Sequence, residues 1–254
     1  MGLFCEIRYH YDLRKTNQFV FLKANIFDHQ FQSKTMNRLF KLPLLIVFLL
    51  ICTSAFAQTD TLGLFTDHMD IGNPKNKGNA QYDKVTHTYT LKGSGYNIWF
   101  NRDEFQYLFK KIKGDFTVTA NFQFIGDKGN GHRKIGWMIR QSIDDKSIHV
   151  SAVEHGDGLT VLQWRSLTGE NMKDPEGEIF YPEKNFEVVQ LQRIGKKLIM
   201  RVGHVGEILK TVGAHIMNNM PGEALVGLFI CSHDPEVTEE AKIWDVHIDI
   251  PTKQ

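Results

Sequence analysis

The sequence predicts an all-β fold, a sandwich or jelly roll of two antiparallel sheets. Apolar and polar residues alternate with a period of two in many separate windows, which is typical of half-buried strands. Short segments rich in glycine and aspartate separate these windows, as expected for the turns of antiparallel sheets. Outside one ambiguous segment, no window shows helical spacing of its apolar residues. Many strands with short glycine-rich turns indicate a sandwich.

In chain order, the alternating windows cover residues 85–91, 116–124, 135–140, 147–154, 159–165, 198–202 and 243–250. Residues 225–230 are apolar throughout, which predicts a strand covered on both faces. Residues 105–112 fit either a helix or a strand. We predict a strand there, because Gly114-Asp115 turns this segment directly into the strand at 116–124.

An export signal precedes this β-rich region. Residues 36–41 are basic, residues 42–52 are apolar, and Ala55-Phe56-Ala57 ends the segment, which is the order of a secretory signal peptide. We expect cleavage near Ala57, a periplasmic or extracellular location, and no transmembrane segment after processing; the alternative is an uncleaved signal anchor. Residues 1–35 are interpreted as an upstream extension from a start codon placed too early. Residues 58–254 are predicted to form a single β-sandwich domain.

Composition excludes some function classes. The chain has 30 basic and 29 acidic residues and a formal net charge of +1, so it lacks the basic excess of a nucleic-acid-binding protein. Cys231 is the only cysteine beyond the predicted cleavage site, so no disulfide is expected within residues 58–254. We expect Cys231 to be a buried small hydrophobic residue.

Several motifs resemble a known family. They are His68-Met69-Asp70-Ile71-Gly72, Asn97-Ile98-Trp99, His155-Gly156-Asp157-Gly158, Leu162-Gln163-Trp164-Arg165 and Cys231-Ser232-His233. Together, across about residues 63–250, the chain resembles the concanavalin A-like jelly-roll domain of bacterial envelope proteins. That domain is found ahead of TolB-like propellers and, in related form, behind β-xylosidase domains. The resemblance implies a concanavalin A-like sandwich and leaves the function open, because one fold hosts many functions.

Catalytic signatures are missing from the sequence. Metalloprotease, P-loop and nucleophile-elbow motifs are absent, and so is the strand-borne carboxylate pair of a retaining jelly-roll glycosidase. The acid-rich stretches 174–178 and 234–240 contain proline and are predicted to be loops. We therefore expect no enzyme activity, with a jelly-roll glycoside hydrolase as the alternative.

A structural calcium ion is a second possibility. Asp67 and Asp70 near the first strand and Asp245 in the last would offer oxygen ligands if the terminal strands pair. The alternative is that Asp245 faces solvent in an alternating strand. No other cofactor is expected.

The candidate binding site comes from strand faces. Arg140, His149, Gln163 and Arg165, with Ser151, should share one face of three neighbouring strands, because successive side chains alternate between the two sides of a sheet. Arginine and amide groups suit sugar hydroxyls or carboxylates, and Trp99 would supply stacking. We expect these arginines to be exposed and to contribute little to stability. The alternative is an ordinary solvated face.

These observations predict an exported, non-catalytic carbohydrate-binding or accessory module whose partner is a carbohydrate or another cell-envelope ligand, with no nucleic-acid partner. Besides the glycoside hydrolase, the alternative is a structural or protein-interaction domain of the envelope.

Overall fold

The computed structural model describes residues 61–173 and 176–252, and within them it contains fourteen β-strands and no helix. In chain order the strands are β1 (Asp67–Ile71), β2 (Asn79–Asp83), β3 (Thr88–Gly95), β4 (Phe105–Lys113), β5 (Phe116–Phe124), β6 (Lys134–Arg140), β7 (His149–His155), β8 (Thr160–Arg165), β9 (Glu178–Phe180), β10 (Val188–Ile194), β11 (Lys197–Gly203), β12 (Lys210–Ile216), β13 (Glu223–Cys231) and β14 (Asp234–Asp249).

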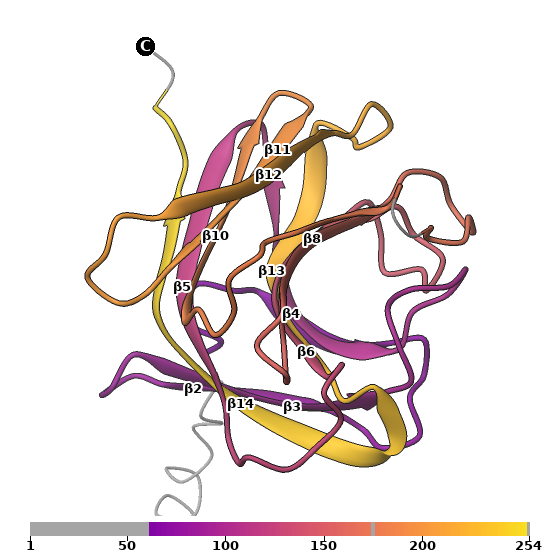
Figure 1. The fold of residues 1–254 in the computed structure, drawn as a ribbon, viewed down its shortest axis with the longest axis vertical. Coiled ribbons are helices and arrows are strands. Elements are labelled where there is room, and N and C mark those ends of the chain that lie inside the picture. The colour runs from indigo at the N-terminus through magenta and orange to yellow at the C-terminus, as the bar shows by residue number, and fades with distance from the viewer. Residues whose placement is uncertain (1–60, 174–175, 253–254) are drawn as a thin grey trace, which may run out of the picture. The chain divides into compact units, whose positions relative to one another are not determined.

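The strands form two seven-stranded antiparallel sheets (Figure 1). We call the sheet with strand order β1-β4-β13-β6-β7-β8-β9 the first sheet and the one with order β12-β11-β10-β5-β14-β3-β2 the second sheet. In Figure 1 the second sheet runs from β12 through β5 to β3 and β2, and the first sheet lies inside its curve. The predicted sandwich of two antiparallel sheets is confirmed.

The main core lies between the two sheets, where alternation turns one side of every strand inward. In β5, Phe116, Val118, Ala120 and Phe122 are all buried there, as the sequence predicts. Trp137 of β6 is fully buried, and its ring packs against that of Phe122 with the centroids 6.4 Å apart. This apolar layer provides the main hydrophobic driving force for folding.

The outward face of the first sheet is also buried, which is unusual for an antiparallel sheet. A second apolar cluster lies on this face. It includes Phe105, Tyr107 and Phe229 of the sheet, Ile71 at the end of β1, and Ile98 from the connection between β3 and β4. Strand β13 is therefore covered on both sides, as its continuous apolar run predicts. The candidate polar residues share this outward face.

Two differences from the sequence prediction have a visible structural cause. The strand predicted at 85–91 begins only at Thr88, because the Asp83 carboxylate accepts hydrogen bonds from the backbone of Val85 and Thr86 and closes a turn. The acid-rich stretch 234–240, predicted to be a loop, is the start of β14, where a register shift between Asp234 and Glu239 absorbs the irregularity. The ambiguous segment 105–112 is a strand, as predicted.

The described residues belong to one unit, Thr59–Gln254. None of them forms a helix long and apolar enough to cross a membrane. The predicted signal peptide at 36–57 and the extension at 1–35 lie outside the described residues, so they stay predictions.

Candidate functional site

Strand register brings the predicted polar residues together on the outward face of the first sheet. Arg140 of β6, His149 of β7 and Arg165 of β8 are direct cross-strand neighbours in one row. In the next row Ser151 lies opposite Gln163, which in turn lies opposite Glu178 of β9. The shared face is as predicted, because the three strands form a simple meander with short turns.

The predicted exposure of this face is wrong. Arg140 and His149 are fully buried, Arg165 is 1% exposed and Gln163 is 3% exposed. The reason is the connection between β3 and β4, residues 96–104, whose Asp103 contacts both arginines from above the sheet. Alternation tells which residues share a side of a strand, and it does not tell what covers that side.

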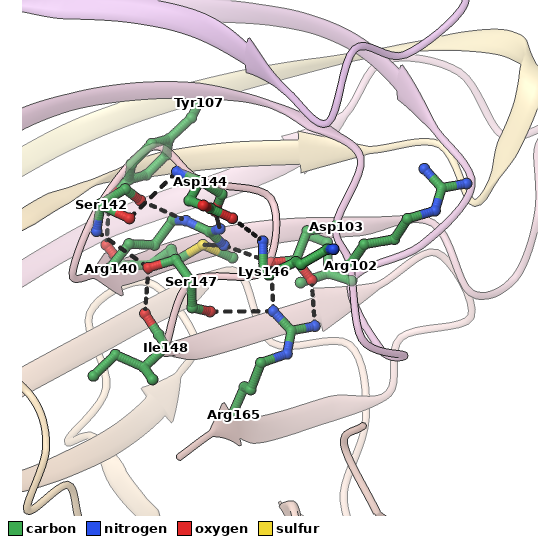
Figure 2. A network of polar contacts seen from close by, with 12 residues as sticks. Arg102, Asp103, Tyr107, Arg140, Ser142, Asp144, Lys146, Ser147, Ile148 and Arg165 are labelled. Carbon is green, nitrogen blue, oxygen red and sulfur yellow. Dashed lines mark hydrogen bonds and ion pairs between the residues drawn. The ribbon is translucent and has the colours of Figure 1, made fainter. Parts of the chain in front are cut away.

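Asp103 is the centre of a buried ion-pair network (Figure 2). Its Oδ2 accepts hydrogen bonds from Arg140 Nη1 at 2.7 Å and Arg165 Nη1 at 2.8 Å, and its Oδ1 accepts one from Arg165 Nη2 at 2.7 Å. Figure 2 shows the two guanidinium groups converging on this carboxylate, while neighbouring Arg102 points away. Burial raises the pKa of Asp103, but Arg140, His149 and Arg165 outweigh it, so the pKa lies below its ordinary value.

Further hydrogen bonds from the guanidinium groups of Arg140 and Arg165 tie loops to the sheet. Arg140 donates to the carbonyl oxygens of Ser142 and Asp144, in the loop after β6. Arg165 donates to the carbonyl oxygens of Phe100, Ser147 and Glu170, which belong to three different loops. Arg140 and Arg165 are therefore positioning residues that hold the loops around this face. The expectation that each contributes little to stability assumed an exposed side chain, and both side chains are buried. We therefore expect truncation of either to be destabilising, because buried carbonyl and carboxylate oxygens lose their hydrogen-bond donors.

The loop held by Asp103 carries three aromatic residues. The rings of Tyr96 and Phe100 stack with centroids 6.2 Å apart, and the Arg102 guanidinium lies 4.5 Å from the Tyr96 centroid. Phe100 is half exposed, and Trp99 is partly buried with its carbonyl oxygen accepting from the Met172 amide at 3.1 Å. The aromatic loop is thus rigidly placed. Stacking of a ligand on Trp99 stays a prediction.

Three side chains beside this network carry polar atoms without a hydrogen-bond partner in the described residues, although the Gln163 amide nitrogen donates to Glu178 Oε2 at 3.4 Å. Both ring nitrogens of His149, the Ser151 hydroxyl and the Gln163 carbonyl oxygen are buried and have no hydrogen-bond partner within residues 61–173 and 176–252. Burial, together with Arg165 and Arg140, holds the pKa of His149 well below its ordinary value in spite of Asp103, so the ring is neutral. A neutral imidazole, a hydroxyl and an amide oxygen offer both donors and acceptors. Such groups are normally satisfied when buried.

Glu154 and Glu178 do not form a glycosidase-like carboxylate pair. Glu154 of β7 pairs with Thr160, so it shares the inward side of the sheet with Val150 and Ala152. Glu178 pairs with Gln163 on the outward side, and it begins β9 where a loop was predicted. Residues on opposite sides of a sheet cannot act together on one bond.

The possibility that the first and last strands pair and bring Asp67 and Asp70 next to Asp245 is not borne out. Asp67 and Asp70 lie in β1, which pairs with β4 at the edge of the first sheet, whereas Asp245 lies in β14 within the second sheet. The Asp70 carboxylate accepts from the Gly78 amide, and Asp245 accepts from the Asn121 side chain at 2.9 Å. Across the described residues, no group of three or more His, Cys, Asp or Glu is placed to hold a metal ion.

A hollow of about 280 Å³ lies where β8 approaches β12, and Arg165 is among the residues that line it. Trp164 also lines it and stacks on His215 of β12 with ring centroids 3.9 Å apart. Trp164 is only 8% exposed, so it offers a ligand little stacking surface. We do not place the candidate site there.

In sequence, the chain matches no family model and no curated protein. In structure, it is similar to a functionally unknown protein from Saccharomyces cerevisiae, with a TM-score of 0.53, 13% identity, and coverage of 73% of this chain and 97% of that one. A second similar structure is carbohydrate-binding module CBM66 from Bacillus subtilis, with a TM-score of 0.44, 13% identity, and coverage of 74% of this chain and 98% of that one. A third is lectin II from Ulex europaeus, with a TM-score of 0.45, 10% identity, and coverage of 73% of this chain and 98% of that one. The predicted jelly-roll sandwich is confirmed, and at these identities the likeness concerns the fold alone.

Proposed function

We propose that this protein is an exported, non-catalytic glycan-binding module of the cell envelope. Its site is the outward face of the first sheet around His149, Ser151 and Gln163, which we call the polar row. The resemblance to envelope domains and the predicted signal peptide support the periplasmic or extracellular location.

The unpartnered groups of the polar row carry the proposal. Burying a hydroxyl or amide without a hydrogen bond costs free energy, so evolution retains such groups mainly where a partner arrives. Three of them on adjacent strands, neutral and of mixed donor and acceptor character, fit the hydroxyl groups of a sugar. The adjoining aromatic loop offers Phe100 and Trp99 for contact with sugar C–H faces, and the Asp103 network holds that loop in place.

Glycan binding is tested by array screening of the purified protein followed by calorimetric titration of the best ligand. Ser151→Ala removes one hydroxyl that has no partner in the described residues, so folding should be unchanged or slightly stabilised. Binding should weaken about 3- to 10-fold, the effect of one neutral hydrogen bond. Gln163→Leu should weaken binding likewise, and it should also lower stability because it removes the hydrogen bond from Gln163 Nε2 to Glu178 Oε2.

The matched control is Gln123→Leu, which changes an exposed glutamine of the second sheet and should leave affinity unaltered. Unchanged affinity in both Ser151→Ala and Gln163→Leu would refute the proposed site. Release of reducing ends from the bound glycan would instead establish the hydrolase alternative.

A further inference from the structure

Basic residues gather at one end of the outward face, four residues along β7 from Ser151. Lys134 begins β6 and lies directly opposite His155, the last residue of β7, and opposite Cys231 at the end of β13. His132 lies two residues before the start of β6, and His233 lies two residues after the end of β13. We call Lys134, His132, His155 and His233 the basic end.

The Lys134 ammonium group is buried without a counter-ion among the described residues. Its Nζ contacts the Asn97 Oδ1 at 3.0 Å, the His132 carbonyl oxygen at 3.2 Å and His233 Nδ1 at 3.4 Å, all of them uncharged acceptors. The ion pairs within residues 61–173 and 176–252 do not include it. Burial lowers the pKa of Lys134, although Cys231 and Glu178 oppose this. Buried charges in proteins are normally paired, so this lysine calls for an anion.

His155 gives a second, independent indication. It is 5% exposed, and neither ring nitrogen has a hydrogen-bond partner in the part of the chain that the structure describes. Its ring lies edge-on to His132 with centroids 5.8 Å apart, and His132 is 5.4 Å from His233. Burial, then Lys134 and His132, holds the pKa of His155 well below its ordinary value. A neutral imidazole beside an ammonium group supplies a further N–H donor for an anion.

The surrounding loops hold these rings in place. Arg133 forms a buried ion pair with Glu239 at 2.8 Å and so anchors the loop that carries His132. The Asn130 side chain accepts from the His132 amide at 2.8 Å and donates to the His233 carbonyl oxygen at 3.5 Å. His233 has a φ of +59°, a left-handed conformation that is strained for a residue with a side chain and is often found at functional sites.

We infer that the basic end binds the anionic substituent of an acidic glycan, a carboxylate or a sulfate, with Lys134 as its counter-ion and His155 as a hydrogen-bond donor. This inference rests on the proposed function. The basic end lies about 14 Å along β7 from Ser151, at roughly 3.4 Å per residue. One oligosaccharide can therefore contact the polar row with its hydroxyls and the basic end with its charge.

The test uses a glycan array that carries uronate-containing and sulfated glycans beside their neutral counterparts. The protein should prefer the acidic glycans by about 10- to 100-fold, the range expected for hydrogen bonds to a charged group. Lys134→Met should abolish this preference and leave the affinity for the neutral counterparts unchanged. The control Lys128→Met, an exposed lysine in the neighbouring loop, should keep it.

A second arm separates this inference from glycan binding itself. At equal ionic strength, sodium sulfate raises the melting temperature of proteins in general more than chloride does. This rise should be smaller in Lys134→Met than in wild type and in the Lys128→Met control. Lys134→Met should itself melt at the same or a higher temperature, because it removes a buried charge that lacks a counter-ion.

The outcomes decide between the two proposals. Equal binding of acidic and neutral glycans, unaffected by Lys134→Met, would overturn the basic end and leave glycan binding standing. A sulfate effect that depends on Lys134, without any glycan bound, would support the anion site and refute the proposed function. No glycan preference together with an equal sulfate effect in wild type and Lys134→Met would overturn the inference.

Discussion

Replacing Asp103 with asparagine keeps the size of the side chain and removes its charge. The carboxylate is fully buried and accepts three hydrogen bonds from Arg140 and Arg165. In Asp103→Asn, an NH2 group replaces one carboxylate oxygen. This hydrogen-bond donor then faces the N–H donors of a guanidinium group. Breaking a buried pair by removing one partner costs about 3–5 kcal/mol, because the other charge stays buried. We expect a loss of about 4 kcal/mol, a large share of the ~5–15 kcal/mol that stabilises a typical domain.

The pH dependence of this loss has a definite sign. Burial acts to raise the Asp103 pKa, but Arg140, His149 and Arg165 bring it below the ordinary value of 3.8. The ionised group therefore stabilises the folded state at every pH above its unfolded pKa, and this contribution disappears as the pH falls through the lower folded pKa. The difference in the free energy of unfolding between wild type and Asp103→Asn should stay constant from pH 7 to about 5 and shrink below pH 4.

Urea unfolding monitored by tryptophan fluorescence measures this difference, because Trp137 is fully buried in the folded protein. Asp127→Asn is the matched control, since Asp127 is exposed, and it should change the free energy of unfolding by less than about 0.5 kcal/mol. An Asp103→Asn variant as stable as Asp127→Asn would refute the assigned role of the network. A difference that grew on acidification would refute the electrostatic reasoning.

Three other features give further expectations. Burial and Glu187 raise the pKa of Glu154 to about 8, so stability should fall as pH rises from about 5 to 8, and Glu154→Gln should flatten this limb of a pH series of melting temperatures. Gly136→Ala should cost about 3 kcal/mol or more in urea unfolding, because Gly136 has a φ of +151° and the added Cβ would lie 2.0 Å from the Ala152 carbonyl oxygen. Cys231 is buried and burial raises its pKa to about 11, so peptide mass spectrometry should find it unalkylated until the protein unfolds, and early labelling would contradict its packing.

The strands were predictable because their side chains have a clear period. β5 alternates as the sequence suggests, and β13 is apolar throughout and covered on both sides. Register across β6, β7 and β8 followed from their short turns, so the shared face of Arg140, His149 and Arg165 was accessible to sequence reasoning. These inferences depend only on local spacing.

Coverage of that face was not predictable, because it depends on a loop distant in sequence. Asp103 lies 62 residues from Arg165 and 37 from Arg140, and no local pattern marks it as buried. One signal was present: two arginines on a shared strand face need counter-ions if that face is covered. Pairing of β1 with β4 likewise depends on long-range topology, which is why the predicted meeting of Asp67 with Asp245 failed.

The position of the last strand has a consequence for how the chain is made. β14 lies between β5 and β3, so it joins the four-stranded part β12-β11-β10-β5 to the pair β3-β2. Until Asp234–Asp249 has been synthesised, the facing edges of β5 and β3 remain unpaired and are sites for aggregation. Synthesis from the N-terminus therefore leaves the second sheet incomplete until β14 has emerged, long after β3 and β5.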